Sequence, residues 1–257
     1  MESLLAAHDI ALVRAANPGP LTLSGTNTWL VGRDPCWVVD PGPALTEHVD
    51  AVLAAASARG GIGGVALTHD HGDHADAAAG VAARAGGVPV AAVRWPGADV
   101  RIEPGARVGP LEAIPVTGHA PDHVCFAVGA ACLTGDAVLG EGSVFIAPDP
   151  GALRGYLDGL RRLRAREFAV LLPGHGPPIA DAAAKLDGYV AHRLEREARL
   201  VAALAGGARS VDALLDGAWA DVPAPMRPVA AITLAAHLDK LEEEGRLPDG
   251  VQRPSWG

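Results

Sequence analysis

A cluster of imidazoles and carboxylates in residues 69–74 carries the clearest chemical signal of the chain. It reads His69-x-His71-x-Asp73-His74. In an extended backbone His69 and His71 point to the same side, because side chains alternate with a period of two. These two can therefore share one cation, while Asp73 and His74 aim at a second. A polar turn with Asp73 as a helix cap is the alternative, but it leaves three histidines unexplained.

Two cations need more than four ligands, so further ones are expected elsewhere in the chain. Three residues have the same setting, since each follows a predicted strand and lies beside a glycine, which lets the backbone approach an ion closely. They are His119, Asp136 and His175. Each one alone fits a loop residue or a helix cap. Three repeats of one arrangement favour a shared metal site.

The elements that must position these residues alternate between short buried strands and helices. The strand at 65–67 delivers the histidine cluster at its carboxyl end, where α/β folds usually place their ligands. Apolar alternation, helical spacing and Gly or Pro boundaries predict the other elements. The expected strands are 26–31, 36–39, 65–67, 88–93, 113–117, 123–128 and 168–172. The expected helices are 45–59, 75–85, 151–166, 181–204, 211–219 and one that starts at Pro228.

Composition restricts the compartment and the partners. The chain has 257 residues, is 49% hydrophobic and carries a net charge of −9. This acidity gives no long-range attraction for polyanions, although two divalent cations would reverse the sign locally. The three cysteines form no CxxC pair, which indicates reduced thiols in a cytoplasmic protein. The start lacks a basic leader and no apolar run approaches membrane-spanning length, so no membrane partner is expected.

The seven candidate ligands, in that order and at those separations, resemble the metallo-β-lactamase superfamily over roughly residues 10–200. The resemblance implies an α/β fold, a four-layer αβ/βα sandwich, and two divalent metal ions, of which zinc is the first expectation. Two departures, Ala75-Asp76-Ala77 and Thr117, affect loop shape and touch no ligand. The ligands implied for the first metal are His69, His71 and His119, and those for the second are Asp73, His74 and His175, with Asp136 bridging both.

Other segments resemble the β-lactamase-like protein 2 branch of that superfamily. They are Asn17–Trp29, Leu139–Ser143, the motif Tyr189-x-x-His192-Arg193 and the helical tail. This branch contains single-stranded endoribonucleases and thioesterases that release polyketide acids from acyl carrier protein. The resemblance implies a catalytic domain at 1–190 and a small helical, winged-helix-like domain at 191–257.

The implied activity is that of a binuclear metal-dependent hydrolase. Two cations about 3.5–4 Å apart lower the pKa of a shared water to about 7, and the bridging hydroxide attacks a carbonyl or phosphoryl centre. Asp73 and Asp136 are the expected catalytic residues. The substrate is expected to be a small ester or thioester or a single-stranded RNA, so an endoribonuclease and an acyl thioesterase are the alternatives. Glyoxalase-II-like thioester hydrolysis is a less favoured one.

Substrate-binding residues are harder to predict. Asn27 is a candidate for the groove, and His192 with Arg193 can bind a phosphate or carboxylate. The alternatives are a turn-forming asparagine and a solvated helix face. Asp122 and His123 lie near His119 in sequence and are proton-donor candidates, but we interpret them as structural.

The tail argues against a nucleic-acid-binding regulator. Residues 205–257 contain five basic and eight acidic residues, a net charge of −3. Contacts to DNA phosphates need the opposite sign, so no duplex DNA is expected as a partner. We expect the tail to pack on the catalytic domain and form a wall of its cleft. The sequence gives no prediction of oligomeric state.

Overall fold

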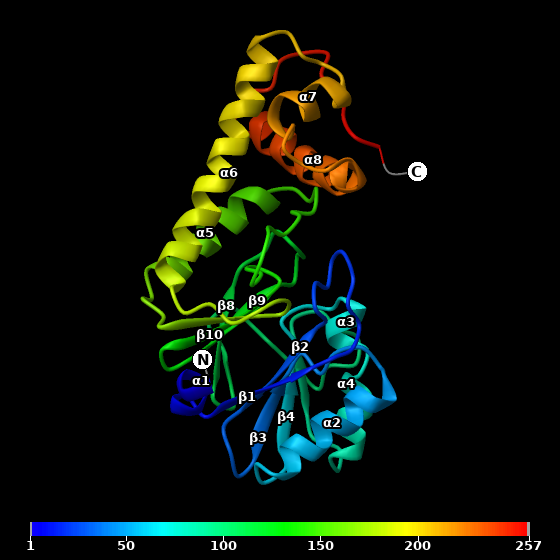
Figure 1. Cartoon of the computed structure of the whole chain (residues 1–257), viewed down its shortest axis with the longest axis vertical. Coiled ribbons are helices and arrows are strands. Elements are labelled where there is room, and N and C mark those ends of the chain that lie inside the picture. Colours follow the sequence, from blue (N-terminus) through cyan, green and yellow to red (C-terminus); the bar gives the residue numbers. More distant parts are fainter. Residues whose placement is uncertain (1, 256–257) are drawn as a thin grey trace.

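The computed structural model describes residues 2–255, and two β-sheets packed face to face form its N-terminal part (Figure 1). The first sheet has the order β1-β2-β3-β4-β5-β6. Its strands are Ile10–Arg14, Asn27–Val31, Cys36–Val39, Ile62–Ala66, Val90–Ala92 and Val100–Arg101. The second sheet has the order β11-β10-β9-β8-β7. In chain order, β7 to β11 are Arg107–Val108, Leu111–Pro115, Val124–Val128, Ala131–Gly135 and Val170–Pro173.

Helices cover the outer face of each sheet. Their bounds are α1 Glu2–Ala7, α2 Thr46–Ser57, α3 Gly72–Ala75, α4 Ala78–Arg84, α5 Ala152–Arg164, α6 Ala182–Ala205, α7 Val211–Ala218, the 3₁₀ helix η1 Ala224–Met226 and α8 Arg227–Glu243. Helices α2 and α4 lie on the first sheet, and α5 and α6 lie on the second (Figure 1). The predicted four-layer sandwich is therefore confirmed.

The period-two alternation of strand β2 shows how the sequence builds these layers. Trp29 and Val31 are buried between the sheets, whereas Leu30 packs under α2 with Val38. A strand whose two faces are both covered has a nearly continuous apolar run; all of β2 is buried, and Trp29–Val31 is such a run.

The C-terminal half is helical. Helix α6 runs without a break across the predicted boundary between residues 190 and 191. It packs on α5 at its start and on α7 at its end. The division into 1–190 and 191–257 thus remains a prediction, and Met1, Trp256 and Gly257 in those ranges lie outside the described residues. From 206 to 255 the structure has α7, η1 and α8 and, in this described part, no strand.

Most predicted elements are confirmed within a few residues, and one predicted helix begins three residues later than expected. The helix expected at 75–85 is interrupted between α3 and α4. The backbone N–H of Ala77 donates to the carbonyl of Gly42, and the N–H of Gly42 donates to the carbonyl of His74. These bonds to a neighbouring turn replace the helical ones. Among residues 2–255, no helix combines the length and the apolar character needed to cross a bilayer.

Candidate metal centre

The candidate ligands gather because their strands end at one edge of the sandwich. Strand β4 leads to the segment 69–74, and β8 leads to His119. Strands β10 and β11 are parallel neighbours, so their carboxyl ends place Asp136 beside His175. The segment after β4 bends at Thr68 and His69 instead of continuing as a strand. The two imidazoles that were expected to share one side nevertheless converge.

The first group of donor atoms contains three imidazoles. Nε2 of His69 lies 3.0 Å from Nδ1 of His71, and Nε2 of His119 lies 3.1 Å from the same nitrogen. A ring nitrogen offers either one hydrogen or one lone pair, so Nδ1 of His71 cannot pair fully with two other nitrogens. A shared cation satisfies all three lone pairs at once.

The second group combines imidazoles with a carboxylate. Nε2 of His74 lies 3.3 Å from Nε2 of His175, and each of them is close to Oδ2 of Asp73, at 3.5 and 3.2 Å. Nitrogen ligands at about 2.0–2.1 Å from a tetrahedral zinc ion stand about 3.3–3.4 Å from one another. The spacing in both groups, 3.0–3.5 Å, fits ligands of one ion each.

Asp136 lies between the two groups. Its Oδ2 is 3.6 Å from Nε2 of His119 and 3.3 Å from Nε2 of His175, and its Oδ1 is 3.5 Å from Nε2 of His74. Oδ1 is buried and has no hydrogen-bond partner. A buried carboxylate oxygen without a donor is costly unless a cation neutralises it, so this position fits a bridging ligand.

Burial and charge tune the donors differently in the two groups. Burial lowers the pKa of His69 well below its usual value and lowers the pKa of His119 to about 4. Burial also opposes charge on His175, but hydrogen bonds to Asp136 and Asp73 outweigh it and raise the pKa of His175 to about 9. His69 and His119 are therefore neutral imidazoles ready to bind a metal, whereas at His175 a metal would take the place of a proton.

Asp40 is a functional residue that sequence reasoning missed. It follows β3, the parallel neighbour of β4, and its Oδ2 lies 3.0 Å from Nδ1 of His74. The same carboxylate accepts hydrogen bonds from the backbone N–H and hydroxyl of Thr68, both at 2.8 Å. A carboxylate behind a ligating imidazole fixes its orientation and tautomer. Asp40 directly follows the expected strand 36–39, and an acidic residue at a strand exit is the sequence signal that could have identified it.

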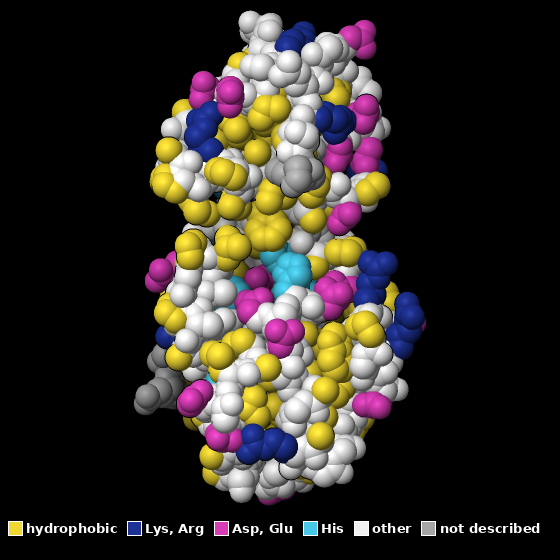
Figure 2. All heavy atoms as spheres, turned by 90° about the vertical axis from the view of Figure 1, so that its right-hand side faces the viewer, with side chains coloured by type: hydrophobic (Ala, Val, Ile, Leu, Met, Phe, Trp, Pro, Cys, Tyr) yellow, Lys and Arg dark blue, Asp and Glu magenta, His cyan; other side chains and the backbone are white. Residues whose placement is uncertain are grey.

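A cavity of about 670 Å³ opens onto these ligands. Figure 2 shows the histidines and acidic side chains at the narrowed middle of the molecule, with a hydrophobic area beside them. The β-sandwich contributes the loop 20–23 and the segment 139–145, and the C-terminal helices contribute residues within 222–229. The expected wall by the tail is thus present in the cavity lining.

The loop that carries residues 20–23 is held by Asn17. Its side chain donates to Oγ1 of Thr26 and accepts from the N–H of Thr26, both at 2.9 Å. Oγ1 of Thr26 in turn lies 3.3 Å from Oδ2 of Asp73. Gly25 has a φ of +119°, and a Cβ there would lie 2.1 Å from the carbonyl oxygen of Ala15. This explains why the segment 17–26 needs both an asparagine and a glycine.

The structure does not bring the predicted substrate-binding residues to the metal ligands. The amide of Asn27 is buried and donates to the carbonyls of Pro173 and Gly176, so it holds the loop around His175. Arg193 is 2% exposed and donates to Oγ of Ser143 and to the carbonyl of Val144. Substrate contact by Asn27, His192 and Arg193 remains a prediction.

His192 and the two proton-donor candidates have other neighbours. His192 lines a smaller cavity of about 150 Å³, and burial lowers its pKa to about 4. Nε2 of His123 accepts a hydrogen bond from the backbone N–H of Asp136, which favours our structural interpretation of His123. Asp122 is buried and absent from the cavity lining, and burial raises its pKa to about 6.

Two family models match the chain. Residues 77–175 match the metallo-beta-lactamase superfamily, and residues 210–250 match the beta-lactamase associated winged helix domain. The chain therefore contains a metallo-beta-lactamase superfamily domain followed by a beta-lactamase associated winged helix. Members of this superfamily are typically hydrolases and typically bind divalent metals. The winged-helix match covers α7, η1 and α8, in agreement with the expected winged-helix-like tail.

Relatives and solved structures extend the likeness to nearly the whole chain. The beta-lactamase-like protein 2 homolog of Caenorhabditis elegans is 29% identical, over 89% of this chain and 82% of the relative. The atrochrysone carboxyl ACP thioesterase of Emericella nidulans is 32% identical, over 70% of this chain and 61% of that protein.

Two solved structures are similar in fold. A beta-lactamase domain protein from Burkholderia ambifaria has a TM-score of 0.78 at 20% identity and covers 94% of this chain and 89% of its own. A protein crystallised in a di-iron-bound form has a TM-score of 0.54 at 26% identity and covers 67% of this chain and 96% of its own.

Proposed function

We propose that this protein is a binuclear metal-dependent hydrolase that acts on a carbonyl or phosphoryl centre. The observation that carries the proposal is the convergence of seven buried or half-buried donors at spacings of 3.0–3.6 Å. In support, the two triads His69, His71, His119 and Asp73, His74, His175 each have donor atoms within 4.8 Å of one another. The di-iron form of a structural relative supports two ions of this class.

The roles of the residues follow from their contacts. His69, His71 and His119 would hold one cation, Asp73, His74 and His175 the other, and Asp136 both. A bound pair of divalent cations supplies hydroxide near neutral pH and polarises the oxygen of the group under attack. Asp40 positions His74, and Thr26 positions Asp73. We propose zinc as the metal, because a set of five imidazoles and two carboxylates suits it, although the same set also accepts iron or manganese.

Three substrate classes fit this proposal, and one alternative function lies outside it. An acyl thioester is favoured by the thioesterase among the relatives. A simple ester requires the same chemistry, and a single-stranded RNA would make the protein an endoribonuclease. A nucleic-acid-binding regulator ranks last, because α8 packs its Leu234, Leu238 and Leu241 into the helical core and its start lines the cavity.

The proposal includes a cytoplasmic location. It is supported by three buried free thiols, Cys36, Cys125 and Cys132, since thiols persist in a reducing compartment.

One experiment tests the proposal directly. The zinc-loaded protein is analysed for metal content and assayed against acyl esters, acyl thioesters and a labelled single-stranded RNA. We expect the wild type to bind two equivalents of metal per chain. Turnover should fall at least about 1,000-fold in Asp136→Ala. The control Asp158→Ala, at an exposed position, should keep the metal content and the turnover of the wild type. Fewer than one equivalent, or unchanged turnover in Asp136→Ala, would overturn the proposal. Intact RNA beside fast thioester turnover would exclude the endoribonuclease.

A further inference from the structure

The cavity above the candidate metal centre is apolar on the sides away from the ligands. On one side lie Leu21 and Leu23, on another Val144 and Phe145, and opposite them the C-terminal helices contribute Met226 and Val229. Leu21 is 54% exposed, more than the exposed side chains of Leu45, Val100 and Leu194. An exposed leucine on the rim of a cavity loses water contact when an apolar group enters.

Apart from the candidate ligand histidines, the charged residues of the same cavity are acidic. Glu141 lies in its wall and Asp73 and Asp136 lie at its base, and within the described chain its lining contains no Lys or Arg. A nucleic acid brings phosphates on both sides of the bond that is cut, and their binding needs cationic side chains. The lining therefore favours a substrate that is uncharged and apolar beyond its reacting group.

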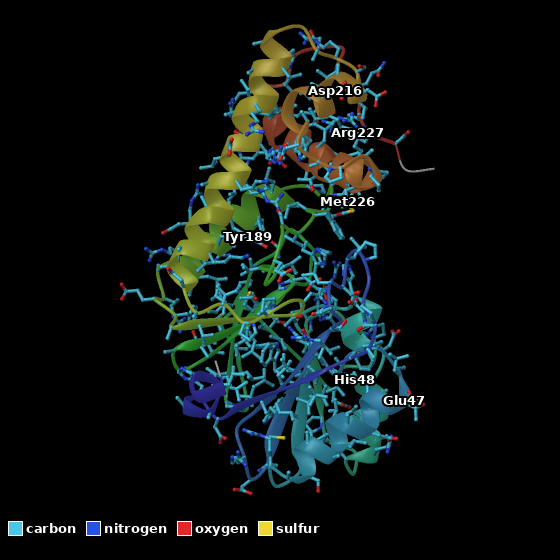
Figure 3. All side chains as sticks on the ribbon, in the orientation of Figure 1. Glu47, His48, Tyr189, Asp216, Met226 and Arg227 are labelled. Atoms are coloured by element: carbon cyan, nitrogen blue, oxygen red, sulfur yellow. The ribbon has the colours of Figure 1, made fainter. Side chains whose placement is uncertain are left out.

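The cavity continues toward the C-terminal half. The smaller cavity of about 150 Å³ shares part of its lining with the large one, including Phe145, Met226 and Val229. It reaches inward to Trp219 and Thr233. Arg193 and Arg196 also line it, but their guanidinium groups are hydrogen-bonded to Val144 and Asp221. Figure 3 shows Met226 on the side of the C-terminal helices that faces the β-sandwich. Met226 thus stands where the two cavities meet, and an unbranched, flexible side chain there can yield to an extended ligand.

We propose that the substrate is an ester or thioester of an apolar acyl chain, and that the C-terminal helices select it by length. This inference rests on the proposed hydrolase function. The carbonyl lies at the metal ligands, the chain lies between Leu21 and Met226, and Met226 sets how far it extends. Hydrolysis breaks the acyl C–O or C–S bond and joins the oxygen of water to the acyl carbon. One proton of the water leaves with the alcohol or thiol, the other passes to the solvent, and the product is the carboxylate.

The first arm of the test is the dependence of hydrolysis on chain length. Zinc-loaded protein is assayed with 4-nitrophenyl esters and N-acetylcysteamine thioesters from two to twelve carbons. We expect kcat/KM to rise about twofold to fourfold per methylene until the cavity is filled. Met226→Trp should lower the ratio of decanoyl to acetyl kcat/KM at least about tenfold, and Met226→Ala should shift the optimum to longer chains. Leu194→Trp, at an exposed position of α6, is the matched control and should change neither.

The second arm measures binding without turnover. Acetate, hexanoate and decanoate are titrated calorimetrically into the zinc-loaded protein, so that the carboxylate stays constant and only the chain varies. We expect decanoate to bind at least about tenfold more tightly than acetate in the wild type, and Met226→Trp to remove this difference. Length-dependent binding without hydrolysis of any ester would sustain the inference while the proposed function fails. Hydrolysis or binding that is independent of chain length, or faster cleavage of RNA than of every acyl substrate, would overturn the inference.

Discussion

Oδ2 of Asp40 lies 3.0 Å from Nδ1 of His74, and both side chains are at most 1% exposed. Burial opposes charge on His74, but the carboxylates of Asp136 and Asp40 outweigh it and raise its pKa well above the usual value. The imidazole is therefore oriented from behind by Asp40 and presents Nε2 to the candidate centre. Removal of the rear carboxylate changes the basicity and the orientation of that nitrogen together.

Asp40→Asn is predicted to weaken the second metal site. Affinity for zinc at that site should fall about 10-fold to 100-fold, because loss of the carboxylate behind a ligating histidine has this effect in metalloproteins. Competition with a chromogenic chelator measures it. Asp50→Asn, which removes an exposed carboxylate paired with Arg84, serves as the control. Equal affinities in Asp40→Asn and the control would refute the role given to Asp40.

Single ligand substitutions are predicted to separate the two ions. His71→Ala removes a donor of the first group and His175→Ala one of the second, so each should retain about one equivalent of metal instead of two. His192→Ala should retain two, because His192 lines a different cavity. Plasma mass spectrometry of dialysed protein gives the count. Two equivalents in both ligand variants would contradict the grouping.

Arg193 is predicted to act as an anchor for the segment at the cavity wall. Its guanidinium donates to Ser143 and Val144 and lies 5.5 Å from the ring centre of Tyr156. Arg193→Met should lower the free energy of unfolding by about 2 kcal/mol, because hydrogen bonds from a buried charged donor are lost. Urea unfolding measures the change, and Arg193→Lys should recover part of it.

Substrate binding by Arg193 predicts a different pattern. It would raise KM for anionic substrates selectively and leave the free energy of unfolding near that of the wild type. Measurement of KM for neutral and anionic acyl substrates in Arg193→Met decides between the two roles.

Gly25→Ala is predicted to destabilise the loop 17–26. Its positive φ and the close carbonyl of Ala15 leave no room for a Cβ, so a loss of at least about 2 kcal/mol is expected. Gly188→Ala, in the exposed middle of α6 with nothing near its Cβ, should instead gain about 0.5–1 kcal/mol. Thermal unfolding of both variants tests the contrast, and equal shifts would refute it.

Strands and ligand candidates could be predicted where the signal lies in residues that are neighbours in the sequence. The strand at 36–39 has the expected bounds, and the ligand candidates were found because the exits of short buried strands are visible in the chain. Asp40 escaped because its contact with His74 joins residues 34 positions apart and arises from the parallel pairing of β3 with β4. Pairing between strands is a tertiary property that periodicity does not reveal.

The helical segments show the same limit. The break between α3 and α4 depends on a hydrogen bond from Ala77 to Gly42, and the burial of Arg193 depends on the segment 143–144 covering α6. A polar helix face is interpreted as solvent-exposed when the segment that covers it in the folded protein is unknown. Strand β1 was missed because its alternation is weak, with only Ile10 fully buried.

The donors come from both sheets: the segment after β4 belongs to one, while His119, Asp136 and His175 follow strands of the other. Cations bound there would link the two sheets at this edge of the sandwich. Such ions would bind only when both sheets are in place, so their removal is expected to lower the stability of the folded sandwich.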